Sequence, residues 1–114
     1  MTSEVILDDE DGKLVTLARG AQARADTAQG AAVRDGDGRT YAGAPVTART
    51  LSLSALQVAV ATALSSGADA FEAAVLVGGA DDDPGLATLA EISSDAYAIL
   101  TDGRGAPVER LGGR

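Results

Sequence analysis

Three parts of the chain carry apolar side chains at helical spacing. Residues 11–25 place five of them on one face, namely Leu14, Leu17, Ala18, Ala21 and Ala25. Residues 52–66 are apolar nearly all round, which is typical of a helix buried between a sheet and another helix or subunit. A shorter helix is predicted over residues 85–92, because Asp83 suits an N-cap and Pro84 suits a first helical turn.

Shorter apolar runs predict the strands. Residues 30–34 and 40–44 flank Asp35-Gly36-Asp37-Gly38, and Asp-Gly pairs favour the tight turn of a β-hairpin. Such aspartates also occur in calcium loops, but the later ligands and the closing Glu are missing here, so the hairpin is favoured. Residues 73–77 have the pattern of a central strand, and residues 97–101 that of a last strand.

The remaining segments are expected to be irregular, with a loop at residues 45–50 and a tail at residues 106–114. The run Asp81-Asp82-Asp83 could hold magnesium or calcium, but sequence-adjacent carboxylates rarely converge on one ion, so a solvated helix cap is favoured. The order helix, strand, strand, helix, strand, helix, strand indicates an α/β protein whose mixed sheet is covered by helices. A length of 114 residues fits a single domain over residues 1–114.

The composition limits the chemistry that the chain can perform. Hydrophobic residues make up 46% of the chain but aromatic residues only 3%, so the core must consist mainly of Ala, Val and Leu. The chain has no His and no Cys, and therefore no imidazole base, thiol nucleophile, disulfide or zinc site with nitrogen or sulfur ligands. Carboxylates, hydroxyls, one lysine and the arginines remain as candidate functional groups.

The net charge limits the partners. Seventeen acidic against nine basic residues give −8 at pH 7, which opposes binding to nucleic acid and to an anionic membrane. The N-terminus lacks the basic start and apolar run of a signal peptide, and no apolar stretch approaches the roughly 20 residues of a membrane span. The absence of cysteine is compatible with a reducing compartment, so a soluble, cytoplasmic protein is expected.

One series of motifs extends over nearly the whole chain. After the first helix come GAAVRDGDGRTYAGAPV at residues 30–46, the buried helix with Gly67-Ala68 behind it, the strand AAVLV, AEI at residues 90–92 and LTDGRG at residues 100–105. In this order and spacing the chain resembles the cytidine deaminase superfamily. The resemblance implies a three-layer α/β/α sandwich of the cytidine deaminase-like type and assembly into a homodimer or homotetramer.

The zinc site that the resemblance implies has no matching residues in this sequence. The family binds zinc through a Cys/His-Ala-Glu motif at one helix start and Pro-Cys-x-x-Cys at the next, and its glutamate transfers protons. The first motif falls on Ser54-Ala55-Leu56, which places a hydroxyl at the ligand position and an alkyl group at the glutamate position. The second falls on residues 81–85, with Asp82 and Gly85 where the thiolates would be.

Other family positions are replaced as well. The Asn-x-Glu that holds the ribose aligns with Pro45-Val46-Thr47, and the aromatic residue before the first strand is missing from residues 25–29. Ser and Asp are ordinary N-caps, so both helix starts are expected to be capped and Leu56 is expected to join the core. No catalytic residue, metal ligand or cofactor is predicted. The candidate remnant of the cleft consists of Pro45, Thr47, Ser54, Leu56, Asp82 and Gly85.

Three functions remain open, and the preferred one is a non-catalytic pseudo-deaminase that acts as a scaffold or interaction subunit. The second is a module that binds a nucleoside or another small molecule in the remnant cleft, where helix amides could bind an anion. The third is an enzyme of different chemistry that uses residues 81–83, or Asp35 and Asp37, as metal ligands or as acid and base. A cytidine deaminase label given by similarity alone would not establish the activity, because fold does not imply function.

Overall fold

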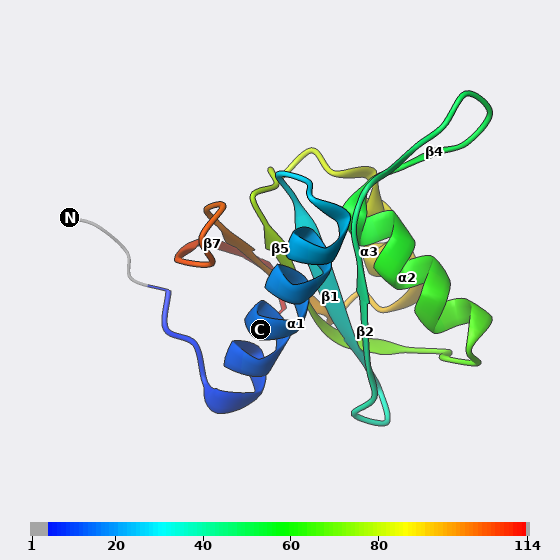
Figure 1. The fold of residues 1–114 in the computed structure, drawn as a ribbon. Helices are drawn as coiled ribbons and strands as arrows, with labels where there is room; N and C mark the ends of the chain where they lie inside the picture. Colours follow the sequence, from blue (N-terminus) through cyan, green and yellow to red (C-terminus); the bar gives the residue numbers. More distant parts are fainter. Residues whose placement is uncertain (1–4, 114) are drawn as a thin grey trace.

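The structure, a computed structural model, describes residues 5–113 (Figure 1). A five-stranded sheet in the order β2-β1-β5-β6-β7 forms its centre. The parallel pair β5 and β6 lies among antiparallel neighbours, so the sheet is mixed as expected. The strands are β1 (Gly30–Asp35), β2 (Thr40–Gly43), β5 (Phe71–Val77), β6 (Tyr97–Thr101) and β7 (Pro107–Gly112).

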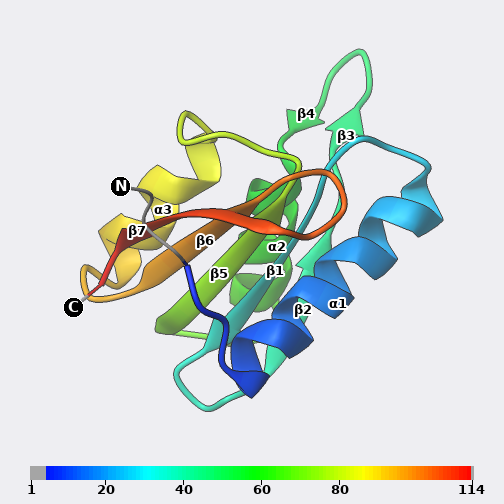
Figure 2. The ribbon, with the colours of Figure 1, turned by 90° about the vertical axis from the view of Figure 1, so that its left-hand side faces the viewer.

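Helices cover both faces of this sheet. α1 (Asp9–Ala25) lies on one face, and α2 (Ala55–Ser65) and α3 (Pro84–Ile92) lie on the other, as Figures 1 and 2 show from two directions. The predicted three-layer α/β/α sandwich is therefore confirmed. No helix among residues 5–113 is long and apolar enough to cross a membrane.

The alternation of side chains along the strands builds two apolar layers. In β1, Ala31 and Val33 contact the α2 side while Ala32 contacts the α1 side, and all three are fully buried. The layers are thin because small residues line them. At Gly43, for example, an added Cβ would lie 2.7 Å from the backbone nitrogen of Ala59, so α2 can approach β2 only where the strand has no side chain.

The first helix begins two residues earlier than predicted. Asp8 is its N-cap and accepts a hydrogen bond from the backbone nitrogen of Asp11 at 2.8 Å. Its predicted apolar face is only partly right. Leu14, Ala18 and Ala21 are buried, whereas Leu17 is 38% exposed and Ala25 is exposed, because the contact with the sheet is narrower than the apolar stripe.

Two segments expected to be irregular form strands instead. The predicted loop at 45–50 contains β3 (Val46–Thr47), which pairs with β4 (Ser52–Leu53) in a separate two-stranded sheet, and we call residues 46–53 the arm. The arm projects from the body in Figure 1, and α2 consequently begins at Ala55. The predicted tail contains β7, an edge strand. Its mixed sequence PVERLG has one exposed face, so it lacks the continuous apolar run of a central strand.

Candidate functional site

The start of α2 is closed by its own side chains. Ser54 is the N-cap, and its hydroxyl accepts a hydrogen bond from the backbone nitrogen of Gln57 at 3.0 Å. The Gln57 side chain in turn accepts from the backbone nitrogen of Ser54 at 2.9 Å. This reciprocal capping box satisfies two of the free amides at the helix start, as the sequence predicted for Ser54.

The start of α3 lies beside it and is capped by Asp83. One carboxylate oxygen of Asp83 accepts hydrogen bonds from the Gly85 backbone nitrogen and from the Ser54 hydroxyl, both at 2.7 Å. The hydroxyl of Ser54 therefore accepts from its own helix and donates to the cap of the next one. A carboxylate at two helix N-termini is favourable because both macrodipoles present their positive ends there.

Leu56 fills the space beneath these caps. It is fully buried in the layer between the sheet and α2, which agrees with the prediction that it joins the core. Gly85, also buried, lies directly against it, because a Cβ at Gly85 would be 2.7 Å from Cγ of Leu56. The position that carries the proton-transferring glutamate in the resemblance thus carries an alkyl group packed against a glycine.

The structure places the six candidate cleft residues in three positions. Ser54 and Asp82 line an open depression of about 350 Å³ at the helix starts. Leu56 and Gly85 lie buried below it. Pro45 and Thr47 lie at and in the arm, and neither lines the depression. The full lining consists of Gln29, Ser54, Gly78, Gly79, Ala80, Asp82, Asp83 and Pro84.

These residues do not fit a zinc ion. Structural and catalytic zinc sites take at least three protein ligands, usually Cys, His or a carboxylate. Gly85 has no side chain, and the Ser54 hydroxyl is a neutral group already bound to Asp83. Across residues 5–113, no three acidic side chains are grouped so as to hold a metal ion.

Asp35, the other candidate acid, serves the hairpin between β1 and β2. The residue is 2% exposed, and its carboxylate accepts hydrogen bonds from the backbone nitrogens of Asp37 and Arg39, both at 2.9 Å. The hydroxyl of Tyr41 donates to the other oxygen at 3.3 Å. The predicted hairpin is present, and this acid satisfies its turn.

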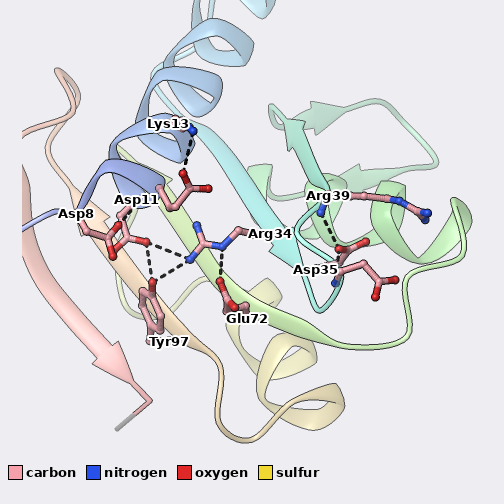
Figure 3. Close-up of polar contacts among 10 residues, drawn as sticks. Asp8, Asp11, Lys13, Arg34, Asp35, Arg39, Glu72 and Tyr97 are labelled. Atoms are coloured by element: carbon pink, nitrogen blue, oxygen red, sulfur yellow. Dashed lines mark hydrogen bonds and ion pairs between the residues drawn. The ribbon is translucent and has the colours of Figure 1, made fainter.

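A buried ionic cluster on the α1 face was not predicted (Figure 3). Arg34 is 5% exposed, and its Nη2 donates to the Tyr97 hydroxyl at 3.1 Å and to Asp11 at 3.4 Å, while its Nε donates to Glu72. The Tyr97 hydroxyl donates to Asp11 at 2.7 Å. Sequence reasoning missed the cluster because its members are up to 86 residues apart and none forms a recognisable motif.

The cluster shifts the pKa values of Arg34 and Tyr97. Burial alone would lower the pKa of Arg34, but its hydrogen bonds to Glu72 and Tyr97 offset this effect and raise the pKa. Burial raises the pKa of Tyr97, and the hydrogen bond to Asp11 adds to that shift. The Arg110 guanidinium lies 4.0 Å from the centre of the Tyr97 ring, a cation–π contact that covers the ring. Through Asp11, the cluster connects α1 to the strands that carry Arg34 and Tyr97.

Comparisons with known proteins identify the family and the fold. Residues 7–105 match the family described as cytidine deaminase-like. A search of curated proteins finds no match. A cytidine deaminase from Burkholderia pseudomallei superposes with a TM-score of 0.76 at 21% identity, over 93% of each chain.

Two mycobacterial structures are similar as well. The cytidine deaminase from Mycobacterium leprae gives a TM-score of 0.69 at 18% identity, over 89% of this chain and 93% of that one. The one from Mycobacterium tuberculosis gives 0.67 at 23% identity, over 82% and 85%. At these identities the similarity shows the fold alone.

Proposed function

The chain belongs to the cytidine deaminase-like family, and we propose that it is a non-catalytic member, a pseudo-deaminase that acts as a scaffold or interaction subunit. The observation that carries the proposal is the burial of Leu56 against Gly85 at the position of the family's motif residues. An alkyl group there can neither accept nor donate a proton. Binding water for a hydrolytic attack would also require space that this side chain occupies.

The caps above Leu56 support the same proposal. A site that activates a ligand leaves helix amides or acidic groups free to receive it. Here the Asp83 carboxylate accepts from Ser54 and Gly85, and the Ser54 hydroxyl has a partner on each helix. The polar groups at the two helix starts stabilise the fold by binding one another.

We further propose that the protein assembles as a homodimer or homotetramer. Part of α2 is covered by the sheet and α3, but Ala61 and Leu64 lie on the outside, and Leu64 is 39% exposed. Outside the helices, Leu51 and Val108 are 51% and 64% exposed. A helix of a second copy packed on the outer side of α2 would cover Ala61 and Leu64, and closed symmetric assemblies are the commonest oligomers of soluble proteins.

The catalytic part of the proposal is tested with the purified protein. Elemental analysis is expected to find no stoichiometric zinc, and incubation with cytidine or deoxycytidine is expected to yield no ammonia above a blank without protein. The cytidine deaminase from Burkholderia pseudomallei serves as the positive control for the deamination assay. Zinc bound one to one, or deamination above the blank, would refute the proposal.

A second candidate function is a small-molecule module that binds a nucleoside in the depression. It is favoured by the open space of about 350 Å³ between Gln29 and Asp82. Isothermal titration with cytidine and uridine tests it, with Gln29→Ala as the variant that should lose binding and Ser65→Ala, exposed at the end of α2 and outside the lining, as the control. Absence of heat with either nucleoside at millimolar concentration would reject this candidate for nucleosides.

A further inference from the structure

A pocket of about 620 Å³ lies at the end of the sheet opposite the helix starts. It is formed at the first residues of the parallel strands β5 and β6, whereas the depression at the helix starts follows the last residue of β5. Its volume is within the range of small-molecule pockets, about 300–1,000 Å³. The lining consists of Gly36, Phe71, Glu72, Asp95, Tyr97 and Arg110.

Two walls of this pocket belong to the buried ionic cluster. Arg34 donates to Glu72 and to the Tyr97 hydroxyl, so one buried cation holds both side chains (Figure 3). A register shift between Arg34 and Asp35 leaves Glu72 with no residue opposite it on β1. A bulge of this kind re-aims the side chain of the extra residue. The walls are therefore fixed by the fold before a ligand arrives.

The charged groups of the lining have capacity left for a ligand. The Glu72 side chain is 57% exposed, and Arg34 occupies its Oε1, which leaves Oε2 available. Among residues 5–113, neither Asp95 nor Arg110 takes part in an ion pair. The Arg110 guanidinium lies over the Tyr97 ring, and the N–H donors at its edge stay free to bind an anion.

The balance of charge indicates which ligand fits. The cluster and the pocket together contain three carboxylates and two guanidiniums, those of Asp11, Glu72, Asp95, Arg34 and Arg110. One negative charge is therefore left over, and the net charge of −8 of the whole chain also attracts a cation. A purely cationic ligand would be repelled by Arg110, so the ligand needs a negative group as well.

From this arrangement we propose that the pocket binds a free basic α-amino acid of the lysine or arginine class. Its two cationic groups bind Glu72 and Asp95, and its carboxylate binds Arg110. Its aliphatic stem lies against the rings of Phe71 and Tyr97. Each free charge of the lining is then used once. The proposal is independent of the remnant site, because the length of β5 separates the two positions.

Equilibrium dialysis of the full chain with radiolabelled compounds tests the ligand. L-lysine is compared with L-norleucine, which lacks the side-chain cation, and with cadaverine, which lacks the carboxylate. We expect saturable binding of one L-lysine per chain and at least about tenfold weaker binding of both analogues, since each loses a charged contact. No saturable binding of L-lysine or L-arginine at millimolar concentration, or equal binding of either analogue, would overturn the proposal.

Variants of the lining test the residues. Asp95→Asn and Arg110→Gln should each weaken L-lysine binding about tenfold, and Arg110→Gln should not weaken binding of cadaverine. Both residues are exposed, so the variants should keep the thermal midpoint within a few degrees. Glu109→Gln and Arg104→Gln are the matched controls, because they make the same charge changes at exposed positions outside the lining. Equal losses in the control variants, or loss of cadaverine binding in Arg110→Gln, would overturn the assigned contacts.

Discussion

Substitution of Leu56 offers the sharpest test of how the remnant site is filled. The side chain is fully buried, and truncating such a leucine to alanine costs about 2–5 kcal/mol. Its neighbour Gly85 has no side chain that could move into the vacated space, so the cavity should persist. We therefore expect Leu56→Ala to lower the free energy of unfolding by about 3–4 kcal/mol.

The assay is urea denaturation followed by circular dichroism, together with thermal melting. For a chain of this length each kcal/mol corresponds to about 4–8 °C, so the midpoint should fall by more than about 10 °C. Leu64→Ala is the control, since the same residue type on the same helix is 39% exposed and should change stability by less than about 1 kcal/mol. Equal effects at the two positions would refute the buried placement of Leu56.

Leu56→Glu extends the test to charge. The introduced carboxylate would be buried without a partner, and burial raises a carboxyl pKa above its unfolded value of about 4.3. The charge penalty grows as the pH rises above the unfolded pKa, is complete above the folded pKa, and shrinks again as the pH falls towards 4. Leu56→Gln, a neutral side chain of similar size, should therefore be more stable than Leu56→Glu at pH 7, with a smaller difference near pH 4. A stable Leu56→Glu variant at pH 7 would mean that the position opens to solvent.

Two further predictions concern the polar clusters. Ser54→Ala and Asp83→Ala should each destabilise the chain and should couple by about 1–2 kcal/mol in a double-mutant cycle measured in urea, because they share one hydrogen bond; additive effects would contradict the link between the helix starts. Tyr97→Phe should cost about 1–3 kcal/mol near neutral pH, since it removes the 2.7 Å donor of Asp11 and an acceptor of Arg34, leaving Asp11 only the longer bond from Arg34. Because the pKa of Tyr97 is raised in the folded chain, neutral Tyr97 contributes stability that is complete below the unfolded pKa near 10 and is lost as the pH rises through the folded pKa. The loss of stability at alkaline pH should therefore be smaller in Tyr97→Phe.

The sequence predicted the elements whose apolar pattern is strong. The strand at residues 97–101 has the predicted bounds, and α3 begins one residue before its predicted start with Asp83 as its cap. The arm and β7 were missed because short, half-exposed strands carry little periodic signal and are held by pairing with distant partners. The edge strand β7 is held by its pairing with β6, and the sequence of β7 alone does not predict that pairing.

The candidate site likewise contains local features that the sequence predicts and long-range contacts that it does not. Caps are local, so Ser54 and Asp83 could each be predicted from residues within one helical turn. Their contact with each other joins residues 29 apart in the sequence, and no local rule contains it. Arg34 was missed because its hydrogen-bond partners Asp11 and Tyr97 are distant in the sequence and come close to it only in the folded chain.

The link between Ser54 and Asp83 also shows how a chain without the Cys and His ligands that the resemblance implies holds its two helix starts together. A metal held by ligands from two helix starts fastens those helices and neutralises the charge that gathers there, and its binding energy contributes to folding. In this chain a hydroxyl–carboxylate hydrogen bond fastens the same two helices, and the carboxylate takes the favourable position at both dipoles. Leu56 then supplies apolar burial where a catalytic group would have cost stability. This arrangement keeps the architecture, so the fold and the proposed loss of catalysis are compatible.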